Sequence, residues 1–482
     1  MASSAQLTPR NFMQLVIDRN AEVAYARLQA RIADRGFVAE STLYQPVLFS
    51  SLRHESRTRQ RTAEEQLSTL GSRVSVLDEN VDTLQTGLRM RAPNGAEVSV
   101  SVQQANRRNN LIATTYDGDK ESTAQLVVTV RQPLLKGLGR DAVETDLRVA
   151  ELERDVGYWT YRQQLLKMGN DALAAYWQLQ RAYLVHPVRL RLLENARETV
   201  TDTEDRVFAG RVAVTAVDEA RAFASIRESD VARSVQSISE AEARIRTLLD
   251  LPPEDRNWRI RSGDPLVMPA LDTAPQASPR WEQAVDLWPP YKIARLRVQQ
   301  NEHRLRFAAN QMLPQFDIQA NWGSYGLGHS QQTAVDPVKH NRYPDWYVGV
   351  YFETPIGRVT RADAQYEGQA LKVTQSELEA NNARISFAND FHSRTESLIA
   401  ARRDVVQLRA DLASRNALLK ADELAIRDNL APRSRVLRRE AERLESEIRL
   451  IEGEARLLSL QTLLAQSEGT LLSDYGVEIN RP

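Results

Sequence analysis

A narrow apolar stripe along the segment from Val436 to Leu472 restricts the folds open to this chain. Its members recur at alternating steps of four and three residues, at Leu437, Ala441, Leu444, Ile448, Ile451, Ala455, Leu458, Thr462 and Ala465. An average spacing of 3.5 residues places them along one side of a helix. Because the other faces are charged, the stripe is narrower than the apolar band of an ordinary globular helix and requires a partner helix of the same kind.

The preceding segment supplies that partner. Its apolar residues fall seven apart, at Leu398, Val405, Leu412, Leu419 and Ile426. Between the two segments, Asn429 tolerates a left-handed turn and Pro432 suits the first turn of a new helix. The pattern therefore predicts a long antiparallel helical hairpin over residues 358–475.

A second hairpin of this kind is predicted over residues 141–251. Its first helix runs about seventy residues to Ala209, which is roughly 100 Å at 1.5 Å per residue. Gly210 begins a break in the pattern, after which a second helix returns to Leu251.

The two hairpins fall in the same register of the chain. Pro133 matches Pro355 at an offset of 222, and Gly210 matches Asn429 at an offset of 219. We interpret this as an internal duplication, with repeats at 1–279 and 280–482. Each repeat is expected to open with a helix, over Pro9–Glu40 in the first and Trp281–Met312 in the second.

Four segments alternate apolar and polar residues, which predicts strands with one apolar face. They are Val98–Gln104, Gln125–Arg131, Phe316–Gly323 and Trp346–Phe352. The turn at Pro93-Asn94-Gly95 predicts a hairpin over residues 87–104, in which the stretch before the turn is a short additional strand. The polar, charged stretch over residues 53–82 carries no pattern to which we assign a structure.

Composition excludes several classes of function. The 482 residues include no cysteine, which excludes disulfides, thiolate metal sites and cysteine nucleophiles. Lys plus Arg number 63 against Asp plus Glu 64, so charge gives no case for a nucleic-acid partner. The six histidines form no ligand pair at helical spacing, and we predict no metal site, no cofactor and no catalytic centre.

No apolar run approaches the ~20 residues of a membrane-spanning helix. The first residues lack the apolar core of a signal peptide, so the protein is either cytoplasmic or a mature form whose leader has been replaced.

Short motifs at the junctions resemble those of the TolC family of outer-membrane channels. They are Gln132-Pro133-Leu134-Leu135 with Gly139, Thr354-Pro355-Ile356-Gly357 in the second repeat, Phe208-Ala209-Gly210 with Val214-Thr215, and Leu313-Pro314. Their order and the repeat of about 220 residues extend the resemblance over nearly the whole chain. It implies a trimer with a β-barrel in outer-membrane lipid, which continues into a long α-helical tunnel through the periplasm. It also implies a periplasmic adaptor and an inner-membrane transporter as partners.

Closure of the barrel agrees with that resemblance. A membrane barrel needs at least eight strands, since an open edge leaves backbone groups unpaired in lipid. One chain with four membrane-type strands, and with Gly87–Met90 as an extra strand outside the bilayer, cannot close a barrel, whereas three such chains can. The fold class we predict is therefore mainly α with a β-barrel portion, internally duplicated and trimeric.

Aromatic residues cluster around the last two predicted strands, at Trp322, Tyr325, Tyr343, Trp346 and Tyr347. They fit either an aromatic girdle at a membrane interface or the core of a soluble sheet.

The hairpin tips are the candidate functional site, as a periplasmic gate and docking end. The residues concerned are Gly210, Val214, Asp218, Asp428, Asn429, Arg435 and Arg438. Arg435 and Arg438 stand three apart, so both can project from one helical face. In a trimer they would form a positive ring, relieved by carboxylates such as Asp428 or Asp218, by bound anions, or by keeping the tips apart. In the alternative arrangement both arginines point outwards and pair with Glu440 or Glu442.

The sequence thus favours a non-enzymatic exit duct for efflux or secretion. The alternative is a soluble coiled-coil scaffold without a lumen, which has no use for alternating strands with Trp at their ends.

Overall fold

The computed structural model describes residues 6–67, 74–112, 120–252, 261–262, 280–357, 360–428, 431–477 and 481. The chain divides into two compact units. The helical unit contains Met1–Ile32, Asp155–Arg295 and Leu378–Pro482, and the sheet unit contains Ala33–Arg154 and Leu296–Glu377. Each unit draws on both halves of the chain, and the division into repeats at 1–279 and 280–482 stays a prediction.

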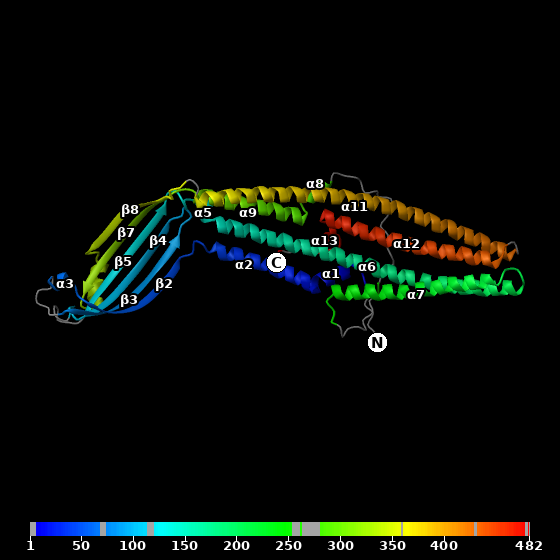
Figure 1. The fold of residues 1–482 in the computed structure, drawn as a ribbon, viewed down its shortest axis with the longest axis horizontal. Coiled ribbons are helices and arrows are strands. Elements are labelled where there is room, and N and C mark those ends of the chain that lie inside the picture. Colours follow the sequence, from blue (N-terminus) through cyan, green and yellow to red (C-terminus); the bar gives the residue numbers. More distant parts are fainter. Residues whose placement is uncertain are drawn as a thin grey trace. The chain divides into compact units, whose positions relative to one another are not determined.

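Both predicted hairpins are present (Figure 1). The first joins α6 (Thr145–Phe208) to α7 (Thr215–Leu248), and the second joins α11 (Arg361–Arg427) to α12 (Arg433–Glu468). The apolar stripe of α12 is largely buried, through Leu437, Leu444, Ile448, Ala455, Leu458 and Thr462. The narrow seam therefore has the partner that its spacing required.

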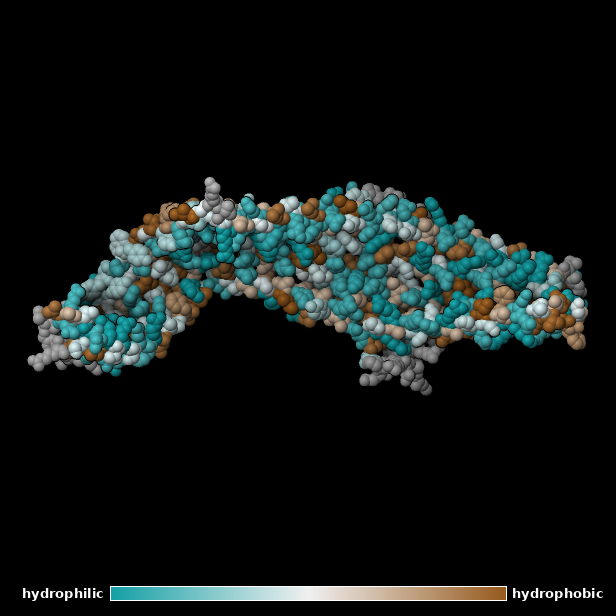
Figure 2. All heavy atoms as spheres, viewed as in Figure 1, coloured by the Kyte–Doolittle hydropathy of each residue, from teal (hydrophilic) through white to brown (hydrophobic). Residues whose placement is uncertain are grey.

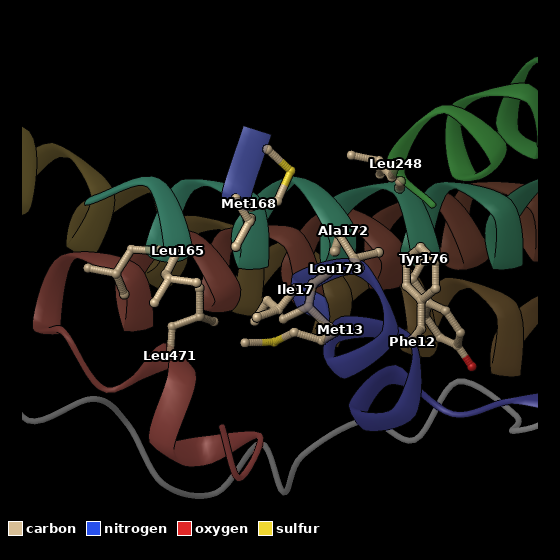
Figure 3. Packing of buried hydrophobic residues seen from close by; sticks show 14 of the residues in the cluster. Phe12, Met13, Ile17, Leu165, Met168, Ala172, Leu173, Tyr176, Leu248 and Leu471 are labelled. Carbon is tan, nitrogen blue, oxygen red and sulfur yellow. The ribbon is translucent and has the colours of Figure 1, made fainter. Parts of the chain in front are cut away.

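The core of the helical unit forms where several helices meet (Figure 3). Helices α1 (Pro9–Arg19) and α13 (Leu471–Asp474) contribute side chains to one cluster with α6 and the end of α7. Leu173 and Tyr176 of α6 lie in this cluster at 0% and 1% exposure. Phe12 packs with its ring centroid 6.2 Å from that of Tyr176.

The single helix predicted over Pro9–Glu40 is wrong, because Asn20 divides it into α1 and α2 (Ala21–Ser41). Asn20 has an extended ψ of 128°, and its side-chain oxygen accepts hydrogen bonds from the backbone N–H groups of Glu22 and Val23. These bonds cap the start of α2. The Asn20 amide also donates to the Leu248 carbonyl at 3.0 Å, which ties the break to the end of α7.

The single helix predicted over Trp281–Met312 is also wrong, because the structure has two helices there, α8 (Arg280–Val285) and α9 (Pro289–Gln311). Two consecutive prolines, Pro289 and Pro290, stand at the start of α9. Proline lacks the N–H that would continue the preceding helix, but it fits the first turn of a new one. The other short elements are α3 (Ala63–Leu67), α5 (Arg140–Val143) and a parallel pair, β1 (Gln6–Leu7) with β6 (Arg261–Ser262).

The sheet unit holds six antiparallel strands in the order β2-β3-β4-β5-β7-β8 (Figure 1). Their bounds are β2 Val47–Gln60, β3 Val76–Arg91, β4 Glu97–Asn109, β5 Lys120–Pro133, β7 Gln315–Gly328 and β8 Pro344–Glu353. The four predicted strands lie within β4, β5, β7 and β8.

The sheet therefore holds two more strands than the four predicted for the barrel, and the number of strands in the barrel stays a prediction. The stretch over residues 53–82 supplies most of β2 and the first part of β3, and the short strand expected before Pro93 is the end of β3. These strands escaped prediction because both of their faces are polar over much of their length, so the alternation that reveals a strand is confined to a few leucines. None of the described helices is both long and apolar enough to cross a membrane.

Replacing Leu173 by alanine should destabilise the helical unit by about 2–5 kcal/mol, because the cavity lies among fully buried side chains. Trp177, which is 7% exposed in the same cluster, provides a fluorescence signal for urea unfolding. The matched change Val235→Ala, at a side chain 53% exposed, should alter the unfolding free energy by no more than about 0.5 kcal/mol. Equal effects of the two changes would contradict this description of the core.

Candidate functional site

The six-stranded sheet has one apolar and one polar face. The pairing register places apolar residues of the predicted strands on a single face, which confirms the apolar faces expected from their alternation. These residues are Val98, Val100, Val102, Leu126, Val128, Val130, Trp346, Val348, Val350 and Phe352. Several of these side chains are open to the surroundings, with Val348 at 65% and Val350 at 68% exposure. We call this the apolar face.

The aromatic cluster divides between the two faces. Trp322 and Trp346 are direct partners across β7 and β8 on the apolar face, and Trp346 is 69% exposed. Tyr325 and Tyr347 fall on the polar face by the alternation of the same strands. The exposure of Trp346 does not fit a side chain in a soluble sheet core. The division also means that only part of the cluster can belong to a girdle.

Helix α10 (Gln331–Lys339) covers one end of the apolar face above Trp322. Ser324, Gly326 and Gly328 lie on that face beneath the helix, and the Ser324 hydroxyl donates to the Val338 carbonyl at 3.3 Å. A Cβ atom at Gly326 would collide with the carbonyl oxygen of Ala334, so the close approach requires glycine. The exposed apolar face on β7 therefore ends at Trp322.

The polar face carries ion pairs near the end where β5 leaves the sheet. Arg131 donates to Asp317 Oδ2 through Nη2 at 2.7 Å and through Nε at 2.9 Å. Asp317 is 0% exposed and also accepts from the Gln315 amide at 2.7 Å. Arg91 and Glu97 form a further pair at 2.8 Å. Charged side chains paired in this way suit a surface in contact with water.

The tip of the first hairpin agrees with the predicted turn. Gly210 has a φ of +66°, a left-handed conformation that favours glycine, and its N–H donates to the Val207 carbonyl at 2.8 Å. Phe208 is 97% exposed and Val214 is 71% exposed, while Asp218 lies exposed in the first turn of α7. Figure 2 shows apolar residues gathered over the tips of the hairpins.

The tip of the second hairpin is held by an acid that the sequence did not single out. Asp422 of α11 is 5% exposed and lies between two arginines of α12. Its Oδ1 is 2.9 Å from Nη2 of Arg435, and its Oδ2 is 3.4 Å from Nε of Arg439. A carboxylate this buried needs such partners, since burial of an unpaired charge is costly.

Within one chain Arg435 thus pairs with Asp422, which was not among the carboxylates named from the sequence, and the ring of arginines in a trimer stays a prediction. For Arg438, Nε lies 4.0 Å from Oε1 of Glu442, as in the outward-pairing alternative. Asp428 is an exposed turn residue after α11, and Asn429 lies outside the described residues.

Hydrogen bonds also connect the two hairpins within the helical unit. Asn195 of α6 is buried and donates to the Leu437 carbonyl of α12 at 3.0 Å and to Glu440 at 3.2 Å. Glu198 pairs with Arg433 at 3.2 Å. The second hairpin is therefore fixed to the first one next to the tip.

Further along the second hairpin, Asp411 accepts hydrogen bonds from the Ser446 hydroxyl at 2.7 Å and from Nε of Arg415 at 2.9 Å. These bonds stabilise the carboxylate and lower the pKa of Asp411. Like Asp422, Asp411 lies on α11 and binds a residue of α12. Among the described residues, no group of His, Asp and Glu side chains could hold a metal ion.

Sequence reasoning missed Asp422, Arg439 and Asn195. Spacing along a helix shows which residues share a face, but contacts between helices depend on their relative rotation. The available signal was the position of Asp422, which stands three residues after Leu419 and four before Ile426 and so falls on the side of the apolar seam.

No family model and no curated protein matches this sequence. Solved structures do match nearly the whole chain. VceC, an outer membrane protein of Vibrio cholerae, has a TM-score of 0.65 at 13% identity and covers 96% of both chains. The CmeC outer membrane channel of Campylobacter jejuni has a TM-score of 0.64 at 10% identity over 97% of this chain and 89% of its own.

The MtrE outer membrane channel of Neisseria gonorrhoeae, in its open state, has a TM-score of 0.63 at 13% identity, covering 96% of this chain and 89% of its own. The chain therefore has the fold of outer membrane channels. The particular fold is the TolC-like one, as the resemblance seen in the sequence implied.

Replacing Asp422 by asparagine should loosen the start of α12, because Arg435 and Arg439 lose a shared carboxylate. Hydrogen bonds to charged groups contribute about 1.5 kcal/mol or more, which predicts amide exchange about tenfold faster over residues 433–439. Hydrogen–deuterium exchange followed by mass spectrometry measures this change. The control Asp428→Asn alters an exposed acid and should leave exchange nearly unchanged; the same increase in both variants would contradict the role of Asp422.

Proposed function

We propose that this protein is an efflux-type channel of the outer membrane, a passive exit duct rather than an enzyme. The single observation that carries the proposal is the six-stranded sheet with an exposed apolar face and a charged, ion-paired opposite face. Alternating strands with lipid on one side and water on the other are the pattern of membrane barrels. The fold shared with outer membrane channels supports the same function.

The working form we propose is a homotrimer. One chain offers six strands in the sheet, fewer than the eight of the smallest single-chain membrane barrels. Lipid tolerates no open sheet edge, because no water is present to satisfy the backbone groups. Several copies must therefore contribute to one barrel, and three is the number that the TolC resemblance implies.

We further propose that the helices extend through the periplasm and that the tips form the gate and docking end. The supporting observations are the exposed Phe208 and Val214 at one tip and the arginines at the other. The partners would be a periplasmic adaptor protein and an inner-membrane transporter, in an efflux or type I secretion system. A soluble scaffold is less well supported, because it gives no role to an exposed apolar sheet face.

A charge on the apolar face should be far more harmful than the same charge on the polar face. Val128→Arg places a cation in lipid and should destabilise the assembled barrel by about 2–4 kcal/mol, whereas the neighbouring Thr129→Arg should cost little. Urea titration of the protein folded into lipid vesicles measures the difference. Equal damage from the two changes would show that β5 has no lipid face and would favour the scaffold.

Photo-crosslinkers at Val214 or Ser434 should capture a periplasmic adaptor in intact cells, since these residues lie at the two tips. The matched control is Asn106 in β4, which belongs to the sheet unit. Mass spectrometry of the crosslinked species identifies the captured protein. Adaptor capture from Asn106 alone would place the docking end elsewhere.

A further inference from the structure

We propose that three copies of this chain close a barrel of eighteen strands, in which β8 of one copy pairs with β2 of the next. This inference rests on the proposed trimeric channel and extends it to the interaction surface between copies. The alternative within the same trimer is a twelve-stranded barrel of β4, β5, β7 and β8, with β2 and β3 outside it.

The first argument is that β2 and β3 are full members of the sheet. All fourteen residues of β2 have register partners in β3, from Val47 with Arg89 to Gln60 with Val76. The pairing of β3 with β4 runs from Arg91 with Glu97 to Glu79 with Asn109. The outer edge of β4 is therefore occupied by β3 and is not available to a neighbouring chain.

The second argument is that the apolar face continues onto these two strands. One row of cross-strand partners is apolar over all six strands, through Leu48, Leu88, Val100, Val128, Trp322 and Trp346. Leu48 is 70% exposed, and Leu52, on the same face of β2, is 80% exposed. A hairpin lying in water would have no reason to present leucines at these positions.

The third argument comes from the slope of the apolar band. On β8 it spans Trp346 to Phe352, and on β2 it spans Leu48 to Leu52. The row that joins Leu48 to Trp346 serves as a reference line across the sheet. The middle of the band lies three residues after Trp346 on β8 and two residues after Leu48 on β2. Because β2 and β8 run in opposite directions, these two displacements point towards opposite ends of the sheet. The band thus shifts by five residues in total over the five steps between neighbouring strands, which is an average of one residue per step.

That slope matches a membrane barrel. With about 3.3 Å per residue along a strand and about 4.8 Å between strands, a shift of one residue per step corresponds to a tilt of about 35°. Strands in membrane barrels tilt by about 35–45°, so an apolar band of this slope is level in the membrane across all six strands. The band on β2 and β3 shifts in the same direction as the band does from β5 to β7.

The free edges fit one another. β2 and β8 stand at the two ends of the strand order, and with six alternating strands they run in opposite directions. Placing β8 of one copy beside β2 of the next therefore gives an antiparallel pair. Matching faces then require the even-numbered residues of β8 to lie on the same side as the even-numbered residues of β2. At a tilt of about 35°, eighteen strands give a backbone radius of about 17 Å, against about 11 Å for twelve.

Disulfide crosslinking tests this pairing, and the natural absence of cysteine makes every introduced thiol informative. Gly349→Cys in β8 provides a fixed thiol, and a Cβ at Gly349 meets no atom within 4 Å. It is combined with one cysteine in β2 on the same polar face, in the series Val47→Cys, Phe49→Cys, Ser51→Cys and Arg53→Cys. Opposite-face controls are Leu48→Cys, Ser50→Cys and Leu52→Cys, and a further series places Ser99→Cys or Ser101→Cys in β4.

Oxidation in isolated outer membranes should link whole chains into dimers and trimers for at least one same-face β2 position and for none of the opposite-face controls. Linkage to β4, or a trimer without any link to β2, would overturn the eighteen-stranded barrel. The mass of the unmodified protein in detergent separates the two proposals. A trimer that fails the crosslinking test keeps the channel and rejects this strand pairing, whereas a stable monomer rejects the proposed function itself.

Discussion

Backbone hydrogen bonding between strands is the constraint on which the sheet unit depends. Within this sheet β3, β4, β5 and β7 each have a partner on both sides, so their peptide groups are satisfied without water. This arrangement permits exposed side chains such as Val348 and Val350, because the cost of apolar surroundings falls mainly on unpaired backbone groups and not on aliphatic side chains. Within the six-stranded sheet only the outer edges of β2 and β8 remain unpaired, and these are the edges that the proposed trimer would join.

The helical unit is held by a different combination of interactions. An apolar seam determines which faces of α11 and α12 meet, but a regular seam with a repeat of seven residues permits sliding by one repeat. Acids on α11 with specific partners on α12 remove that freedom. Asp411 binds Ser446, and Asp422 lies between Arg435 and Arg439, so each pair fits only one register. Burial supplies stability here, while the polar contacts supply alignment.

Patterns within one segment were predictable from the sequence, and contacts between segments were not. The spacing of the seam from Leu437 to Ala465 indicates a helix, and the alternation around Val100 indicates a strand. The hairpins and four of the strands could therefore be predicted from such patterns. β2 was missed because beyond Leu52 both of its faces are polar, and only pairing with β3 defines it as a strand. In the sequence Asn20 is indistinguishable from an ordinary helical residue. The break at Asn20 is tied to a contact with Leu248, 228 positions away, whose carbonyl accepts its hydrogen bond. Asp422 likewise gains its role from a neighbouring helix.

The hairpin formed by β2 and β3 has a consequence for how such proteins diversify. A hairpin consists of two antiparallel strands, so the chain returns to the end of the sheet from which it entered. Adding a hairpin therefore increases the number of strands by two and leaves the direction of every other strand unchanged. The segments before β2 and after β3 therefore keep their connections, and α2 still precedes the sheet as α9 precedes β7. The width of a barrel can change in this way through one insertion in one loop, while the sequence that specifies the helices remains untouched.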